Sequence, residues 1–265
     1  MKPPARGVPH LWTQWDRLVP KIRAQAHVVI FLDFDGTLVA IAPRPNQVRL
    51  TPRARGILQR LARHPRVTLV VISGRRRAEL LHHIGIRGIR YFGLYGWERS
   101  TTTALPFSVR QALRRARLQL ARYLRAYPSI WIENKRSTFS VHLLDAAAAL
   151  QHRVRRELRA LLKPFRRTLR IVENLRDAEV LPRSIPGKGI AVRRFLAQPA
   201  FRRSFPIYFG DDFSDESGFA AVRRGLSVHV GKGRATRARH AVHTPSEVAT
   251  ALAKLEAAVT PKPAR

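Results

Sequence analysis

Two strongly apolar runs, separated by an amphipathic segment, constrain the fold of this chain most. The runs His27–Leu32 and Val67–Ile72 are rich in β-branched and aromatic residues and contain no Asp, Glu, Lys or Arg. Between them, residues 51–64 predict a helix, with Thr51 as its cap and Pro52 in its first turn. Strands buried on both faces that alternate with helices are typical of parallel sheets. We therefore expect an α/β fold with a doubly wound parallel sheet.

The same alternation continues after the second run and returns near the C-terminus. The further helices and strands that we expect in this core are a helix over 78–83, a strand over 89–94, a helix over 189–196, a strand over 206–209, a helix over 215–224, a strand over 226–230 and a helix over 246–258. Before the first run, residues 11–26 permit a helix that Pro20 interrupts.

Residues 104–182 follow a different pattern, in which a helix and two strands occur twice. The helices are expected over 108–126 and 146–162, and the strands over 130–133, 138–144, 168–172 and 178–181. Paired strands favour an antiparallel sheet with helices on one face. The predicted domains are an N-terminal appendage helix (1–26), a Rossmann-like core (27–103 and 183–258), an inserted smaller α/β domain (104–182) and a disordered tail (259–265).

Composition excludes several classes of protein. The 265 residues include no cysteine, which excludes disulfides and thiolate chemistry and fits a reducing compartment. No apolar run approaches the roughly 20 residues of a membrane-spanning helix, and Met1 to His10 lack the apolar stretch of a secretory signal. We expect a cytoplasmic monomer without a membrane partner.

The formal net charge is +33, from 50 Lys and Arg against 17 Asp and Glu. Such a field attracts polyanions. The arginines, however, recur along the whole chain, whereas specific nucleic-acid binders cluster charge on one face. The sequence thus predicts non-specific polyanion affinity and no specific nucleic-acid partner. The alternative is a nucleic-acid-binding protein built on an inactive enzyme fold.

The scarce acidic residues are concentrated. Five of the eight aspartates lie in two segments, residues 33–35 and 211–215. Asp33 and Asp35 follow the first apolar run, where one carboxylate can serve as nucleophile and metal ligand and the other as acid and base. Gly36 permits a sharp turn and Thr37 follows it. A simple Asx turn is the structural alternative, but it needs only one aspartate.

Three further segments carry polar groups at expected strand ends or helix starts. The Ser73 hydroxyl is placed to hydrogen-bond a phosphoryl oxygen. Lys188 lies at the start of a helix, where its ammonium can neutralise charge that develops on a phosphoryl group. Asp211, Asp212 and Asp215, with Glu216 beside them, repel one another unless a cation neutralises them. All-oxygen ligation suits Mg²⁺, so Mg²⁺ is the expected cofactor.

Together these four segments closely resemble the signature of the haloacid dehalogenase (HAD) superfamily of phosphotransferases. The resemblance implies that Asp33 attacks phosphorus, that Asp35 protonates the leaving oxygen and then activates water, and that Ser73 and Lys188 hold the phosphoryl group. It also implies that Asp33, the backbone carbonyl of Asp35, and Asp211 bind Mg²⁺. Asp215 and, less directly, Asp212 support that site.

Within this superfamily the chain resembles the trehalose-6-phosphate phosphatases over residues 28–252. The segments that carry the resemblance are Val71–Arg75, Gly93–Glu98, Glu133–Lys135 with Ser137 and His142, Glu179–Pro182, Gly187–Gly189 and Gly210–Glu216. It implies an inserted cap that recognises substrate and a sugar-phosphate substrate. The substrate-binding residues that we expect are Arg75, Glu133, Lys135, His142 and Glu179.

The chain departs from the family pattern at Leu143–Leu144, at Tyr95 and in the loop 182–187. The alternative substrates are sucrose 6-phosphate, a mannosyl phosphoglycerate or a hexose phosphate. A phosphomutase would use the same aspartyl chemistry, but the sequence shows no second acceptor site. For the cap residues and Arg75 the alternative is a solvated charge.

Overall fold

The computed structural model describes residues 8–260, except 43, 100–103, 175–176 and 233–234. The chain divides into two compact units, one formed by Met1–Arg99 with Gly187–Arg265 and the other by Ser100–Pro186. The predicted insertion, 104–182, falls within the second unit. Residues 1–7 of the predicted appendage and 261–265 of the predicted tail lie outside the described residues.

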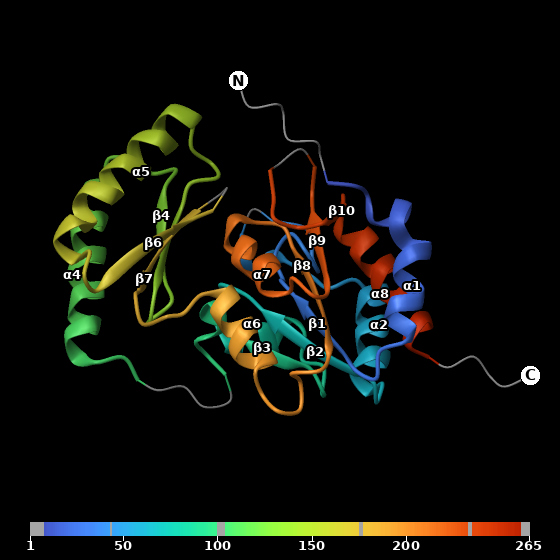
Figure 1. The fold of residues 1–265 in the computed structure, drawn as a ribbon. Coiled ribbons are helices and arrows are strands. Elements are labelled where there is room, and N and C mark those ends of the chain that lie inside the picture. Colours follow the sequence, from blue (N-terminus) through green and yellow to red (C-terminus); the bar gives the residue numbers. More distant parts are fainter. Residues whose placement is uncertain (1–7, 43, 100–103, 175–176, 233–234, 261–265) are drawn as a thin grey trace, which may run out of the picture. The chain divides into compact units, whose positions relative to one another are not determined.

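The first unit contains a six-stranded parallel sheet in the order β10-β9-β8-β1-β2-β3 (Figure 1). Its strands are β1 (Val28–Leu32), β2 (Val67–Ile72), β3 (Arg90–Phe92), β8 (Phe205–Gly210), β9 (Leu226–Val230) and β10 (His240–Val242). Its helices are α1 (Trp15–Arg23), α2 (Pro52–Arg63), α3 (Arg77–His83), α6 (Lys188–Leu196), α7 (Glu216–Ala221) and α8 (Pro245–Val259). The expected doubly wound α/β fold is confirmed.

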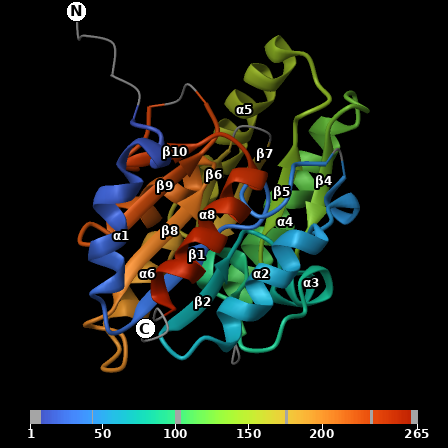
Figure 2. The same ribbon diagram turned by 90° about the vertical axis from the view of Figure 1, so that its right-hand side faces the viewer.

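Side chains of β1 alternate between two apolar cores, because successive strand residues point to opposite faces. Val28, Ile30 and Leu32 pack into a core that includes residues of α1, α2, α3 and α8, and Figure 2 views the unit from the side of α1, α2 and α8. Val29 and Phe31 pack into a second core with residues of α6 and α7. Both faces of the sheet are therefore covered, which explains the continuous apolar runs.

The second unit contains a four-stranded antiparallel sheet in the order β4-β5-β7-β6. Its elements are α4 (Phe107–Leu124), β4 (Trp131–Asn134), β5 (Phe139–His142), α5 (Ala148–Leu162), β6 (Leu169–Glu173) and β7 (Asp177–Pro182). Helices α4 and α5 cover one face of this sheet (Figure 1).

Several expected element boundaries were wrong. Pro20 lies inside α1 without ending it, because the buried side chains of Trp15 and Ile22 hold that helix in the core. The helix expected over 215–224 is only α7, since Asp215 belongs to a preceding 3₁₀ turn and Val222 leaves helical geometry. The strand expected to reach Leu94 ends at Phe92, because Leu94 has a positive φ.

Other differences are small. Strand β10 was not predicted, and α5 begins at Ala148 instead of residue 146. Val259, assigned to the tail, ends helix α8. Among the described residues, no helix combines the length and the apolarity needed to cross a bilayer.

Candidate active site

The loop after β1 places the first aspartate motif at the carboxyl end of the central strand. The backbone N–H of Asp33 donates to the Phe209 carbonyl of β8 at 3.0 Å, and the N–H of Gly36 donates to the Val39 carbonyl at 2.9 Å. Gly36 has φ +82°, the left-handed conformation that favours glycine. A tight turn thus follows Asp33, whose side chain is buried.

The loops after β1 and β8 are in direct contact. A Cβ at Gly36 would lie 2.1 Å from Oδ2 of Asp211, and the Thr37 hydroxyl donates to Oδ1 of Asp211 at 3.2 Å. Because β1 and β8 are neighbouring strands, their carboxyl ends bring Asp33 and Asp211 to the same edge of the sheet. Open α/β sheets bind ligands at this edge.

Lys188, at the start of α6, lies between two carboxylates. Its Nζ donates to Asp33 Oδ1 at 2.7 Å and to Asp215 Oδ1 at 2.8 Å. Asp215 is completely buried and also accepts the Tyr208 hydroxyl at 2.7 Å and the Asp212 backbone N–H at 3.1 Å. Asp215 is therefore fixed by three donors and orients Lys188 toward Asp33.

The carboxylates outnumber the positive charge beside them. Burial raises the pKa of Asp33 to about 7, with Lys188 opposing that shift and Asp215 and Asp35 adding to it. Burial, with the charges of Asp33, Asp215 and Asp212, also raises the pKa of Asp211 well above its ordinary value. Burial alone would lower the pKa of Lys188, but Asp215 and Asp33 outweigh it and raise that pKa.

This donor set fits a hard divalent cation. One carboxylate oxygen from each of Asp33, Asp211 and Asp215 lies within 4.8 Å of the others. All are oxygen donors, and a cation among them would offset the burial and the mutual repulsion that raise the pKa values of Asp33 and Asp211. The Asp215 carboxylate is occupied by Lys188 and Tyr208, so Asp33 and Asp211 are the better placed ligands.

Asp35 and Arg75 form a bidentate ion pair. Nε and Nη2 of Arg75 donate to Oδ2 and Oδ1 of Asp35 at 2.6 and 2.7 Å. The guanidinium also lies over the Phe34 ring, 5.3 Å from its centroid. Arg75 is 7% exposed, so its interpretation as a solvated helix start is wrong.

Ser73 and Asp212 each accept a hydrogen bond from a backbone N–H close to them in the sequence. Ser73 follows β2 at the strand's carboxyl end, is buried, and its hydroxyl accepts the Arg75 backbone N–H at 3.2 Å. The Asp212 carboxylate accepts the Phe213 N–H at 2.6 Å and forms a reciprocal capping box with Asp215. All the core residues that the sequence singled out thus lie in the first unit, and the contacts above link Asp33, Asp211, Asp215 and Lys188.

The remaining predicted residues gather in the second unit, on one face of its sheet. Glu133 pairs with Ser140, and Ser140 with Glu179, across β4, β5 and β7. Nζ of Lys135 lies 3.3 Å from Glu179 and 3.9 Å from Glu133, and His142 Nε2 lies 2.9 Å from Glu133. Glu179 is 1% exposed, so it is not a solvated strand charge.

Sequence reasoning missed several polar or aromatic groups in these clusters. The Trp131 ring stacks on that of His142 at 3.8 Å between centroids, and the Thr138 hydroxyl donates to Glu179 at 2.6 Å. Strand alternation from Glu133 would have placed Trp131 on this face. Tyr208 gave no signal, because its sequence context is that of any apolar strand.

Ser140 is a further member of this face. Its hydroxyl is buried and has no hydrogen-bond partner among the residues that the structure describes. Buried hydroxyls are rarely left without a partner. Ser140 lies between Glu133 and Glu179 on this side of the sheet.

Comparisons with known proteins identify the class and the family. A sequence model of the family Trehalose-phosphatase matches residues 31–252. A trehalose-phosphate phosphatase of Mycobacterium tuberculosis (strain H37Rv) is 31% identical over 239 residues, which cover 83% of this chain and 59% of the relative.

Solved structures share the fold at low identity. The C-terminal domain of the C. albicans trehalose-6-phosphate phosphatase has a TM-score of 0.84 and 19% identity, covering 96% of this chain and 99% of that one. A haloacid dehalogenase-like hydrolase from Bacteroides thetaiotaomicron has a TM-score of 0.61 and 16% identity, covering 86% and 99% of the two chains.

The fold is that of the haloacid dehalogenase-like hydrolases, with a parallel α/β unit and an inserted antiparallel α/β unit. Within that class of proteins, the chain belongs to the trehalose-phosphatase family. It spans about three fifths of the length of the curated mycobacterial relatives that it matches.

Proposed function

We propose that this protein hydrolyses trehalose 6-phosphate to trehalose and phosphate through a phosphoaspartate on Asp33. The observation that carries the proposal is the buried cluster of Asp33, Lys188, Asp211 and Asp215 at the carboxyl edge of the parallel sheet. A phosphoryl group is transferred mainly by positioning and by stabilisation of charge, and this cluster supplies both a nucleophile and a fixed ammonium.

The proposed steps assign one task to each core residue. A carboxylate oxygen of Asp33 attacks phosphorus, and the sugar oxygen leaves with a proton from Asp35. Asp35 then accepts a proton from the water that attacks the phosphoaspartate, so that phosphate is released and Asp33 is restored. Ser73 and Lys188 hold the phosphoryl oxygens throughout.

Magnesium would be held by the carboxylates of Asp33 and Asp211 and by the backbone carbonyl of Asp35. When bound, the ion supplies charge neutralisation to the phosphoryl oxygens. Asp215 and Asp212 act indirectly, because Asp215 fixes Lys188 and Asp212 caps the turn that carries Asp215.

Arg75 holds Asp35 in place in this proposal, in addition to its expected contact with substrate. The bidentate pair fixes the direction in which the Asp35 carboxylate points. Arg75 therefore sets the orientation of Asp35.

Sugar hydroxyls are the proposed ligands of the polar cap face, formed by Trp131, Glu133, Lys135, Ser140, His142 and Glu179. Carboxylates and an ammonium make charge-assisted hydrogen bonds to hydroxyls. Burial alone would lower the pKa of Lys135, but Glu179, Glu133 and Asp177 outweigh it and raise that pKa. Lys135 is thus a permanent donor on this face.

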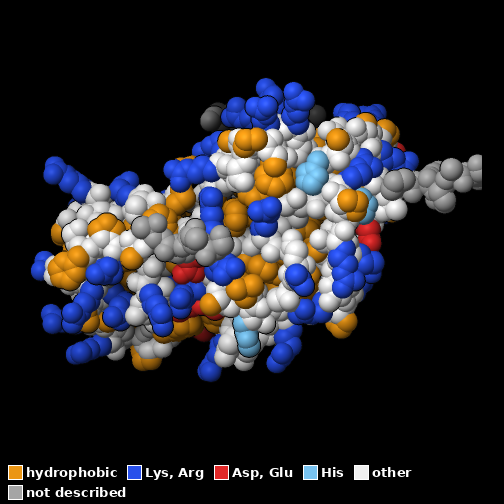
Figure 3. All heavy atoms as spheres, turned by 90° about the horizontal axis from the view of Figure 1, so that it is seen from below, with side chains coloured by type: hydrophobic (Ala, Val, Ile, Leu, Met, Phe, Trp, Pro, Cys, Tyr) orange, Lys and Arg blue, Asp and Glu red, His pale blue; other side chains and the backbone are white. Residues whose placement is uncertain are grey.

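We further propose a cytoplasmic monomer without a specific nucleic-acid partner. The lack of cysteine fits a reducing compartment. On the face shown in Figure 3, Lys and Arg side chains are spread widely instead of forming one patch.

Phosphate release from a panel of esters tests the proposed function. The panel contains trehalose 6-phosphate, sucrose 6-phosphate, glucose 6-phosphate and an aryl phosphate, each assayed with Mg²⁺ and with EDTA. We expect Mg²⁺-dependent turnover with a strong preference for trehalose 6-phosphate. Preference for sucrose 6-phosphate or a hexose phosphate would contradict trehalose 6-phosphate as the substrate but not hydrolysis through Asp33. No phosphate release from any ester of the panel would contradict both.

A further inference from the structure

A second cluster of potential metal ligands lies in the first unit, away from the residues assigned to phosphoryl transfer. It consists of His10, His243 and Glu247, and one ligand atom from each lies within 4.8 Å of the others. His10 precedes the first turn of the described chain, His243 lies in the loop between β10 and α8, and Glu247 lies in the first turn of α8. None of the three belongs to a motif of the proposed reaction.

Backbone contacts fix all three positions. The N–H of Ala241 donates to the Pro9 carbonyl at 3.0 Å, and His10 forms a parallel bridge with Ala241. The Thr244 hydroxyl accepts the Glu247 N–H at 3.2 Å and caps α8. The N-terminal segment is thus paired beside β10, whose following loop carries His243.

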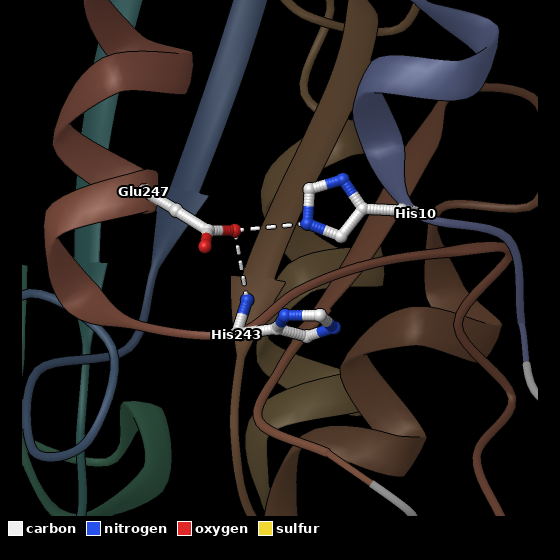
Figure 4. Close-up of side chains that lie close together, drawn as sticks. All are labelled: His10, His243 and Glu247. Carbon is white, nitrogen blue, oxygen red and sulfur yellow. Dashed lines mark hydrogen bonds and ion pairs between the residues drawn. The ribbon is translucent and has the colours of Figure 1, made fainter.

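The three side chains lie close together. Figure 4 shows the His10 imidazole and the Glu247 carboxylate pointing toward one another, with the His243 ring alongside. His10 Nε2 lies 2.9 Å from Glu247 Oε2, and the two imidazole rings are 4.8 Å apart between centroids. Two imidazoles and one carboxylate form a three-ligand set that leaves coordination positions open to water.

Helix capping accounts for only part of this arrangement. Glu247 Oε2 accepts the His243 backbone N–H at 3.0 Å, which stabilises the start of α8. That contact uses the backbone of His243 and not its imidazole. The imidazole of His243 therefore has no part in the cap, and neutral imidazoles are good metal ligands.

We propose that His10, His243 and Glu247 bind one divalent transition-metal ion of the Zn²⁺ class. Imidazole nitrogen with carboxylate oxygen is a donor set that suits Zn²⁺, whereas Mg²⁺ prefers oxygen ligands alone. The side chains of His10 and Glu247 are 25% and 31% exposed, so an ion can enter from solvent. The two clusters of this unit therefore differ in the metal that they select.

Binding requires one change of proton position. Coordination at His10 Nε2 displaces the proton that this atom shares with Glu247, and the proton can move to Nδ1. This change gives up the 2.9 Å hydrogen bond between His10 Nε2 and Glu247 Oε2 and the 3.5 Å contact from the Trp12 N–H to Nδ1. Coordination of the ion by both side chains replaces the first of these.

The bound ion would clamp the N-terminal segment to the start of α8. That segment is already anchored by the buried Leu11 and by Lys254 of α8, whose Nζ lies 5.6 Å from the Trp12 ring centroid. A ligand that binds only the folded state raises its stability by mass action. The clamp would therefore raise the melting temperature without changing the catalytic residues.

Calorimetric titration of the full chain, without a polyhistidine tag, tests this site. Zn²⁺ is added in saturating Mg²⁺, which occupies the acidic cluster. His243→Ala removes an imidazole but keeps the backbone donor of the cap, and His152→Ala, at an exposed position of α5, is the matched control. We expect one tight zinc equivalent in the wild type and in His152→Ala, and a loss of affinity of at least about tenfold in His243→Ala.

Two results would overturn the zinc proposal. The first is no zinc binding by the wild type, and the second is equal affinity in His243→Ala. Absorption spectra with Co²⁺ as the probe check ligation directly, because loss of the His243 imidazole should change the cobalt bands and His152→Ala should not. Phosphatase activity in Mg²⁺ is expected to be the same in all three proteins, so the outcome is independent of the proposed function.

Discussion

Gly36 is the residue on which the geometry of the two aspartate loops depends. It combines a φ of +82° with a space that the Asp211 carboxylate fills. An L side chain in the left-handed region costs roughly 1–2 kcal/mol, and a Cβ here would in addition displace Asp211. The glycine that the sequence suggested for a turn thus also keeps a ligand of the proposed metal site in place.

Gly36→Ala is expected to abolish most Mg²⁺-dependent turnover and to lower the free energy of unfolding by at least about 1 kcal/mol. Activity against magnesium concentration and chemical denaturation measure the two effects. Gly56→Ala is the matched control, because Gly56 lies within α2, where an added Cβ would lie 3.6 Å from the Arg60 guanidinium. In Gly56→Ala the free energy of unfolding is expected to rise by roughly 0.5–1 kcal/mol, because alanine is more stable than glycine inside a helix. Wild-type activity in Gly36→Ala would contradict this account.

Asp33 predicts a specific dependence of stability on pH. Its pKa is raised from 3.8 to about 7 in the folded protein, so the folded state retains a proton that the unfolded state has lost. The contribution of Asp33 is therefore most favourable below pH about 4 and is lost as the pH rises toward about 7. Mg²⁺ favours the ionised form and should reverse this loss.

Melting temperatures of the wild type and Asp33→Asn, measured in EDTA between pH 4 and 8, test the prediction. The wild-type value minus the Asp33→Asn value should decrease over this range, and Mg²⁺ should raise the wild-type melting temperature more at pH 8 than at pH 5. If the difference between the two melting temperatures does not change with pH, the ionisation of Asp33 does not destabilise the folded protein, and the prediction is wrong.

At the scale of elements, the polar face of the antiparallel sheet combines an aromatic ring with charged groups. Trp131 is 39% exposed and stacks on His142, which in turn contacts Glu133. An indole offers an apolar face together with a polar edge, which suits the C–H face of a sugar. We therefore expect Trp131 to contribute to the binding of a sugar and not to the transfer of phosphate.

Trp131→Ala should raise KM for the sugar phosphate several-fold, equivalent to about 1 kcal/mol, and leave kcat for an aryl phosphate unchanged. Steady-state kinetics on both substrates measure this difference. Phe107→Ala is the control, because Phe107 is a 67% exposed aromatic of α4 in the same unit. Equal effects on the two substrates would argue against a sugar-binding role.

The elements that the sequence predicted well are those with strong local signals. The buried strands β1 and β2 and the capped helix α2 were evident, because burial on both faces leaves continuous apolar runs and because Thr51 caps the helix. Strand β10 has only three residues and is held by its pairing with β9 and by Pro9. No local pattern encodes such a contact.

Candidate site residues could be selected from the sequence where the composition is locally unusual. Aspartates concentrated in a chain poor in acidic residues singled out Asp33 and Asp211, whose carboxylates lie close together in the structure. The pairing of Arg75 with Asp35 and the meeting of His10 with His243 depend on tertiary contacts between distant segments. Such contacts leave no trace in spacing or composition.

For the whole molecule, the charge of +33 predicts weak polyanion binding without sequence preference. Lys and Arg are distributed across the surface in Figure 3. We expect retention on heparin and on DNA of any sequence at low salt, with affinity that falls steeply as salt increases. Fluorescence anisotropy with two unrelated duplexes, with and without added salt, measures this, and a strong preference for one duplex would contradict it.

The formation of a phosphoaspartate on Asp33 is the central claim, and a chemical trap tests it most directly. The protein is mixed with trehalose 6-phosphate and Mg²⁺, quenched in acid, and reduced with borohydride, which converts an acyl phosphate of aspartate to homoserine. Peptide mass spectrometry is expected to find homoserine at position 33 only in the presence of substrate. Turnover without this modification, or its appearance at Asp35 instead, would contradict the account.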